Sequence, residues 1–263
     1  MKKYVMLLGI IINVCMSFSQ ISKEDYTTRT QTIHLLFKNM VGDSILRVST
    51  SYANAFGEPF TVRAFKYYIS NIQLKYSNSN VYKINIAPHL VNEKDSTTKQ
   101  LSFIAPAGAI VSIQFLLGID SIINTTGVQT GDLDPAKGMY WVWNTGYIMA
   151  KLEGNSGVAK IPGRQFTYDI GGYKKGENAA RKITLLVSFP PANSSKAEVS
   201  HQNTSVIKNI IIKADVLKWF AGVNDIKIAE QPMCHEPGKL AMQLADNYQQ
   251  MFTIKSNNDN TDK

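Results

Sequence analysis

The sequence predicts an all-β protein, a two-sheet antiparallel immunoglobulin-like sandwich with one short C-terminal helix. Runs rich in β-branched and aromatic residues recur about every ten positions, and clusters of Gly, Pro, Asn and Ser separate them. Apolar side chains alternate within these runs, as at Phe65, Tyr67 and Ile69 before the polar Asn71. Many short strands joined by tight turns are typical of sandwiches and barrels.

The strand signals can be followed along the whole chain. Turn sequences such as Pro106-Ala-Gly and Glu153-Gly-Asn mark where the strands end. The polar segment 190–205 is expected to be a long loop. The segments expected to form strands are 32–37, 65–76, 81–86, 101–104, 110–117, 140–152, 165–170, 182–189 and 206–214.

One helix is expected near the C-terminus. Pro237 suits the first turn of a helix, because the N–H that proline lacks has no partner there. Leu240, Leu244, Tyr248 and Met251 then repeat at helical spacing. This helix is expected to cover an open end of the sandwich.

The first 19 residues have the pattern of a cleavable signal peptide. Lys2 and Lys3 precede an apolar run of about fifteen residues, which is short for a bilayer span. Ser17 and Ser19 then offer small side chains at the two positions that a signal peptidase reads, so cleavage is expected before Gln20. The protein is therefore predicted to be periplasmic or secreted, with a β-sandwich domain at 20–255, a disordered tail at 256–263 and no transmembrane segment.

Composition argues against a nucleic-acid-binding surface and against an internal disulfide. Lys and Arg are scattered, and the net charge of +8 falls to +6 without Lys2 and Lys3, so no nucleic-acid surface is expected. Only Cys234 remains after cleavage, so the mature chain cannot form an internal disulfide. Cys234 is either a small buried residue or a soft metal ligand next to His235.

No local motif for catalysis is visible. The chain lacks a Gly-x-Ser-x-Gly elbow, a phosphate-binding loop, a dinucleotide fingerprint and a His-Glu-x-x-His motif. The four histidines, at positions 34, 89, 201 and 235, lie far apart in sequence. The chain is therefore expected to be a binding protein and not an enzyme.

The segment from Gly118 to Gly154 carries the unusual residues. Asp120, Asp132 and Asp134 lie in a Gly-rich loop, where they either bind a cation or serve the turns. Trp141 and Trp143 follow in an expected strand, where alternation places both indoles on one face. Two adjacent indoles either fill the core or line a site.

Several stretches resemble the MbnP-like family of periplasmic, methanobactin-associated copper-binding proteins. They are Gly118-Ile-Asp-Ser, Gly127-Val-Gln-Thr-Gly-Asp-Leu-Asp-Pro and Gly138-Met-Tyr-Trp-Val-Trp-Asn-Thr-Gly-Tyr-Ile. Tyr52-Ala-Asn-Ala-Phe-Gly-Glu-Pro-Phe, Phe65-Lys-Tyr-Tyr-Ile-Ser-Asn-Ile-Gln-Leu and Phe166-Thr-Tyr-Asp-Ile-Gly-Gly are similar too. The resemblance covers most of the mature chain and is closest to a Bacteroidetes-type member.

The resemblance implies a β-sandwich that handles copper. Copper-handling members oxidise one tryptophan to kynurenine, whose amine holds copper alongside histidine, and a diheme peroxidase-like partner is associated with the oxidation. Trp141 or Trp143 matches the modified position. This chain has Asp169 where the family has a ligand histidine, and Thr125 where methanotroph relatives have another. Aspartate is a harder ligand, which disfavours copper.

Two hypotheses therefore stand. In the first, the protein binds a metal, copper by resemblance, through Trp141 or Trp143 and Asp169, with the carboxylate about 6–8 Å from an indole, the diagonal-neighbour spacing on a sheet. In the second, it is a metal-free interaction module for a protein or a glycan, and its tryptophans are structural. The discriminating observation is whether one of the four histidines approaches Trp141, Trp143 and Asp169.

Overall fold

The computed structural model describes residues 29–144, 146–187 and 206–254. The predicted signal peptide at 1–19, the predicted loop at 190–205 and the predicted tail at 256–263 lie outside these residues. Among the described residues, no helix combines the length and apolar character that a membrane crossing needs.

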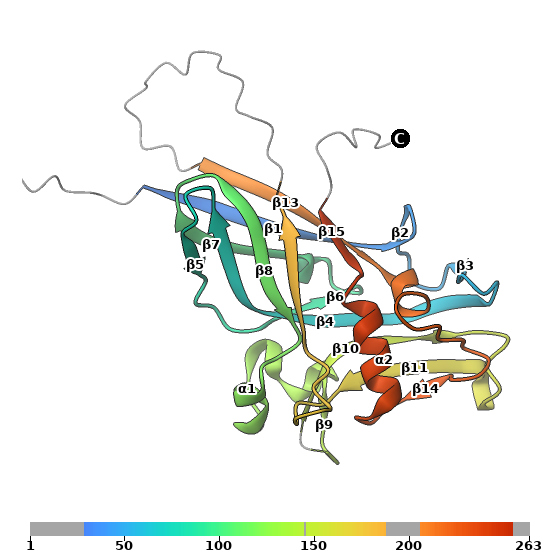
Figure 1. The fold of residues 1–263 in the computed structure, drawn as a ribbon. Helices are drawn as coiled ribbons and strands as arrows, with labels where there is room; N and C mark the ends of the chain where they lie inside the picture. Colours follow the sequence, from blue (N-terminus) through green and yellow to red (C-terminus); the bar gives the residue numbers. More distant parts are fainter. Residues whose placement is uncertain (1–28, 145, 188–205, 255–263) are drawn as a thin grey trace, which may run out of the picture.

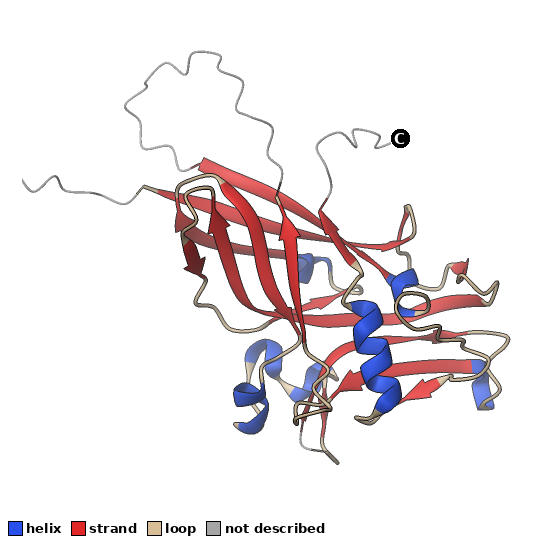
Figure 2. Cartoon of the chain, in the orientation of Figure 1, coloured by secondary structure: helices blue, strands red, loops and turns tan. Residues whose placement is uncertain are grey.

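Two β-sheets form the body of the protein (Figures 1 and 2). The smaller sheet runs in the order β15-β13-β1-β2, and β7 also pairs with β1; its strands are β1 (Thr30–Val41), β2 (Ser44–Ile45), β7 (Gln100–Pro106), β13 (Val206–Asp215) and β15 (Phe252–Ile254). The larger sheet runs β12-β8-β4-β10-β11-β14. Its strands on this path are β4 (Pro59–Tyr76), β8 (Ile110–Leu117), β10 (Gly146–Asn155), β11 (Gln165–Gly171), β12 (Arg181–Leu186) and β14 (Met233–Cys234). The short strands β3 (Ser51–Ala53), β5 (Val81–Lys83) and β6 (His89–Asn92) pair with β4, and β9 (Tyr140–Trp141) pairs with β10.

The two-sheet, mostly β architecture confirms the predicted class. The prediction that all strands are antiparallel is wrong at two places, because β1 pairs with β13 in parallel and β11 pairs with β14 in parallel. The sheets of an immunoglobulin domain are antiparallel, so the immunoglobulin-like arrangement is not confirmed. Chain segments far apart in sequence supply the partner strand in both parallel pairs.

Most predicted strands are present with shifted ends. The segment 110–117 matches β8, whereas β1 and β4 begin earlier than expected, at Thr30 and Pro59. The expected strand at 140–152 is instead a hairpin of β9 and β10, interrupted after Trp141. The prediction of one continuous strand is wrong there, because residues 142–144 form a turn.

The sandwich core lies between the two sheets and is rich in aromatic rings. Phe252 of the smaller sheet contacts Tyr67 and Phe115 of the larger sheet, with ring centroids 5.5 and 5.2 Å apart. Phe37 of β1 meets the Tyr67 ring edge-on at 6.1 Å. Edge-to-face pairs of this kind add to the stabilisation that comes from burial alone.

Two α-helices flank the sheets. The predicted C-terminal helix is confirmed as α2 (Lys239–Tyr248), but Pro237 lies before it and Gly238 caps it, so the placement of Pro237 in its first turn is wrong. Leu244 and Tyr248 face the core, and the Tyr248 hydroxyl donates to the Ala179 carbonyl oxygen. The short helix α1 (Ser121–Thr125) was not expected. The remaining helical segments are the 3₁₀ turns η1 (Ser96–Lys99), η2 (Gly131–Leu133), η3 (Pro135–Lys137), η4 (Pro162–Arg164) and η5 (Val216–Trp219).

Gly154 marks a point of close backbone approach in the larger sheet. The register of β10 against β4 shifts between Glu153 and Gly154. A Cβ at position 154 would lie 1.8 Å from the Thr61 carbonyl oxygen and 2.6 Å from the Phe166 ring. We therefore expect Gly154→Ala to lower the free energy of unfolding by about 3 kcal/mol, measured by urea denaturation.

Gly157→Ala is the matched control, because a Cβ there meets no atom within 4 Å. Its effect is expected to stay within about 0.5 kcal/mol. Equal stability of the Gly154→Ala and Gly157→Ala proteins would contradict this packing argument.

Candidate functional site

Trp141 and Trp143 lie together at the end of β9. Trp141 is 6% exposed and Trp143 is 64% exposed. Their ring centroids are 5.5 Å apart, with the planes tilted by 37°. The predicted proximity is thus present, but its predicted cause is wrong: the strand ends at Trp141, and a turn returns the Trp143 ring to the Trp141 ring.

Gly171, the last residue of β11, provides the space for Trp141. A Cβ at this position would lie 2.5 Å from Cζ3 of Trp141 and 2.9 Å from the Tyr147 carbonyl oxygen. The following Gly172 has a φ of +116°, a conformation that glycine alone adopts readily. Gly171 therefore lets a buried indole contact the backbone of β11 directly, whereas a Cβ at Gly172 would meet the Glu177 carbonyl oxygen at 2.2 Å.

Asp169 lies on the same strand, two residues before Gly171. Strand alternation puts both residues on one face of β11, about 7 Å apart. Asp169 pairs in register with Lys151, whose Nζ donates to Asp169 Oδ2 at 3.0 Å. The distance from the Asp169 carboxylate to an indole stays a prediction. Asp169 and the Gly171 position that Trp141 contacts are nevertheless only two residues apart on β11.

The other carboxylate oxygen of Asp169 has no protein partner. Oδ1 is buried and accepts no hydrogen bond, although the side chain as a whole is 13% exposed. Burial raises the pKa of Asp169, and the Lys151 ammonium opposes that shift. An unpaired buried carboxylate oxygen disfavours the structure unless a water molecule, proton or cation satisfies it.

His235 approaches this cluster through the parallel pairing of β14 with β11. Thr167 is in register with Met233, and Tyr168 with Cys234. Asp169 directly follows Tyr168 in the sequence, and His235 directly follows Cys234. His235 is also the smallest of the causes that act on the pKa of Asp169, and it lowers that pKa. His235 also lines a cavity together with Trp143.

The remaining histidines have other surroundings. His34 lies on β1, where Nδ1 is 2.7 Å from the Ser102 hydroxyl oxygen. His89 contacts the Thr98 carbonyl oxygen and Asp132. His201 lies outside the described residues. Sequence reasoning named His235 only as the neighbour of Cys234 and as one of the four histidines, because its surroundings follow from a two-residue strand that leaves no periodic signal.

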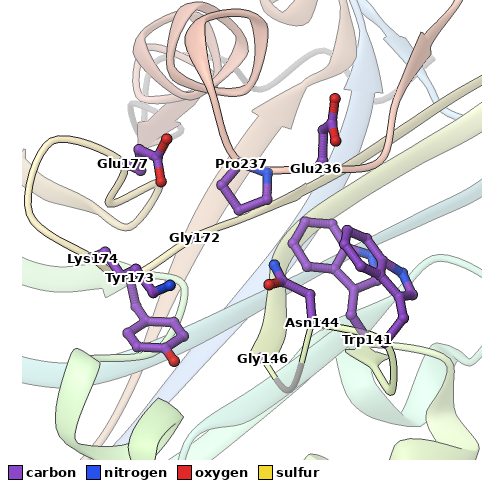
Figure 3. Close-up of a pocket in the computed structure, with 10 residues that line it drawn as sticks. Trp141, Asn144, Gly146, Gly172, Tyr173, Lys174, Glu177, Glu236 and Pro237 are labelled. Atoms are coloured by element: carbon purple, nitrogen blue, oxygen red, sulfur yellow. The ribbon is translucent and has the colours of Figure 1, made fainter.

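Two adjoining cavities form a groove beside the tryptophans. They have volumes of about 230 and 420 Å³ and share Trp143, Glu236 and Pro237. Figure 3 shows the first, with Trp141 and Tyr173 on opposite sides and Asn144 between them. Lys174, Glu177, Gly146 and Gly172 also line this cavity, whereas Met233, Cys234, His235 and residues 238–241 line the second.

Cys234 lines the second cavity. It is a free thiol, 6% exposed, and burial raises its pKa to about 11. Its Sγ lies 3.9 Å from the Glu236 carbonyl oxygen. The interpretation of Cys234 as a small buried residue is the one that this environment favours, because the thiolate form is disfavoured.

The three loop aspartates have separate tasks. Asp120 caps α1 by accepting from the Ile123 N–H at 2.9 Å, and Asp134 caps η3 by accepting from the Ala136 N–H at 2.8 Å. Asp132 contacts His89 at 3.2 Å, Lys137 at 3.3 Å and the Leu90 N–H at 3.1 Å. Within the described residues no group of three or more His, Cys, Asp or Glu side chains could hold a metal ion. These contacts favour the turn interpretation over the cation interpretation.

The chain belongs to the MbnP family. The MbnP family model matches residues 30–236, which is most of the chain. Among solved structures, MbnP from Methylosinus trichosporium is similar, with 14% identity, a TM-score of 0.49, and coverage of 73% of this chain and 77% of that chain. Comparison with curated proteins gives no significant match.

Asp132 provides a test of how the aspartate loop is held. The hydrogen bond from His89 is the largest cause that lowers the pKa of Asp132 to about 2, from the ordinary 3.8. Because the folded-state pKa is depressed, the stabilisation is present above pH 3.8 and is lost as the pH falls toward 2. We expect Asp132→Asn to lower the free energy of unfolding by about 1–2 kcal/mol at pH 7 and by much less near pH 2, measured by urea denaturation.

Asp43→Asn is the control, because Asp43 is exposed and lies in a turn. It is expected to change stability by less than about 0.5 kcal/mol at either pH. A deficit of Asp132→Asn that stayed constant from pH 7 to pH 2 would show that the carboxylate charge is not what holds the loop.

Proposed function

We propose that this chain is an exported MbnP-family binding protein, not an enzyme, that holds copper beside Trp141 and Trp143 after one of them is oxidised to kynurenine. The observation that carries the proposal is the position of His235. It directly follows Cys234, the register partner of Tyr168, just as Asp169 follows Tyr168, and it lines the groove with Trp143. This position of a histidine near the tryptophans and the aspartate supports the metal-binding hypothesis.

The side chains as encoded supply only part of a copper site. His235 offers an imidazole nitrogen and Asp169 a carboxylate, and no third His, Cys, Asp or Glu joins them within the described residues. An unmodified indole N–H is a hydrogen-bond donor without a lone pair for a metal. The encoded residues alone therefore do not fit a copper centre, and the aromatic amine of kynurenine is the donor that would complete one.

Asp169 has a competing cation in the unmodified protein. The Lys151 ammonium lies 3.0 Å from Asp169 Oδ2 and also 3.0 Å from Glu153 Oε1. A metal ion at Asp169 has to displace or share this ion pair, which weakens binding. This competition supports a requirement for the additional donor.

Export of the protein is part of the proposal. It rests on the signal-peptide pattern of residues 1–19. A periplasmic location would give the chain access to a diheme peroxidase-like partner. The partner's oxidation of a tryptophan would require access, and Trp143 is the exposed member of the pair.

The alternative is a metal-free interaction module that binds a protein or a glycan. The observation that favours it is the exposed apolar surface of the groove: Trp143 is 64% exposed and Met233 46%, and Val142, the residue before Trp143, is 79% exposed. Exposed indoles are frequent anchors in binding sites. Copper affinity measured before and after tryptophan oxidation separates the two functions.

The proposal predicts weak copper binding by residues 20–263 produced without a peroxidase partner. Co-production with a diheme peroxidase-like protein of the family should raise copper affinity roughly 100-fold, because one further donor completes the site. Competition with a chromogenic copper chelator measures both affinities, and mass spectrometry confirms the oxidation.

Two variants sharpen the experiment. His235→Ala should abolish the gain, whereas His34→Ala should retain it, because His34 lies on the smaller sheet beside Ser102. One copper per chain at sub-nanomolar affinity in the unmodified protein would contradict the proposed chemistry. Oxidised protein without any gain in affinity would favour the metal-free module.

A further inference from the structure

The segment 226–238, here called the strap, carries one wall of the groove. It contains β14, and its residues His235, Glu236 and Pro237 line the cavities beside Trp143. Its contact with the larger sheet is short, because β14 pairs with β11 through only two residues, Met233 and Cys234. The position of His235 therefore depends on what else fixes the strap.

Glu58 fixes the strap at its other end. Glu58 is buried, with only 7% of the residue exposed. Oε2 accepts from the Ile228 N–H at 2.8 Å, and Oε1 accepts from the Ala229 N–H at 2.9 Å. Hydrogen bonds from buried amides to a carboxylate are stronger than those to a neutral group.

The residues before Glu58 orient its carboxylate. Asn54 Nδ2 donates to Glu58 Oε2 at 2.7 Å, and Asn54 Oδ1 accepts from the N–H groups of Phe56 and Glu58 at 3.0 Å each. These contacts give a role to the Tyr52-Ala-Asn-Ala-Phe-Gly-Glu-Pro-Phe stretch, which the copper proposal does not use. The turn between β3 and β4 presents a buried carboxylate to main-chain amides more than 160 residues away.

The middle of the strap is attached to β11. The Tyr168 hydroxyl donates to the Gln231 carbonyl oxygen at 2.8 Å, and the Thr167 N–H donates to the Pro232 carbonyl oxygen at 2.9 Å. These two bonds and β14 hold residues 231–234, whereas the carboxylate of Glu58 holds residues 228 and 229. Glu58 itself lines neither cavity of the groove.

We propose that Glu58 is a positioning residue for the groove: its carboxylate fastens the strap to the β3–β4 turn and so holds His235 beside β11. Loss of the carboxylate leaves the first half of the strap held by the buried side chains of Ile226 and Ile228 and by the hydrogen bond from the Ile226 N–H to the Phe220 carbonyl oxygen. The two-residue strand β14 then opens more often. A role of His235 in copper binding rests on the function proposed above. The attachment of the strap by Glu58 does not depend on that function.

Cys234 reports strap opening. It is buried on β14 and is the sole cysteine of residues 20–263, since Cys15 lies in the predicted signal peptide. In Glu58→Gln the side chain keeps its size, but an amide group replaces one oxygen and cannot accept from a strap N–H. We expect its Cys234 to react about tenfold faster than wild type with a chromogenic thiol reagent under native conditions.

Tyr67→Phe is the control for a general loss of stability. It removes the buried hydrogen bond from the Tyr67 hydroxyl to Asn39 Oδ1, at 2.9 Å and away from the strap. Its melting temperature should fall while the rate of Cys234 labelling stays that of wild type. Labelling of Glu58→Gln no faster than that of Tyr67→Phe overturns the proposal.

Asn54→Ala serves as the second variant, and it decides the question if Glu58→Gln does not fold. It keeps the carboxylate but removes the amide that orients it, so Cys234 labelling should rise by a smaller factor, about threefold. Labelling at the wild-type rate would overturn the proposal by this route.

Copper affinity after peroxidase treatment gives a readout that a purely structural role would not move. It should fall about tenfold in Glu58→Gln and stay unchanged in Tyr67→Phe. An equal loss in both variants would overturn the positioning role. If treated wild-type protein binds no copper, the proposed function fails, and the labelling rates still decide whether Glu58 fastens the strap.

Discussion

The register of β11 between β10 and β14 is the constraint on which the candidate site depends. On one side this register puts Asp169 opposite Lys151, and on the other side it pairs Tyr168 with Cys234, the residues that directly precede Asp169 and His235. At the end of the strand, Gly171 leaves the space that the Trp141 ring fills. A shift of β11 by one residue would turn Asp169 to the other face of the sheet and separate it from Lys151.

The electrostatics of the site follow from that register. The Asp169 carboxylate is buried, has one oxygen paired with Lys151 and one without a partner, and its pKa is raised by burial. A lysine ammonium therefore provides the positive charge at a position where a metal ion would otherwise neutralise the carboxylate. A metal ion at Asp169 would have to compete with this ammonium, so metal binding depends on which additional donors are present.

The fold was largely predictable from local patterns, whereas the site was predictable only in part. Alternating apolar residues located β8 and most other strands, and helical spacing located α2. The turn after Trp141 escaped prediction because Val142 and Trp143 are good strand formers, and only the tertiary contact between the indoles reveals the turn. His235 and the parallel pairing of β14 escaped because two residues are too few to show a period.

The proposed copper site has the two tryptophans at its centre, and the described side chains alone do not complete it. Tandem mass spectrometry of the protein isolated from its natural source, with copper quantified in the same sample, tests this claim most directly. We expect kynurenine at Trp141 or Trp143 in the copper-containing fraction. Copper-containing protein in which both tryptophans are unmodified would contradict it.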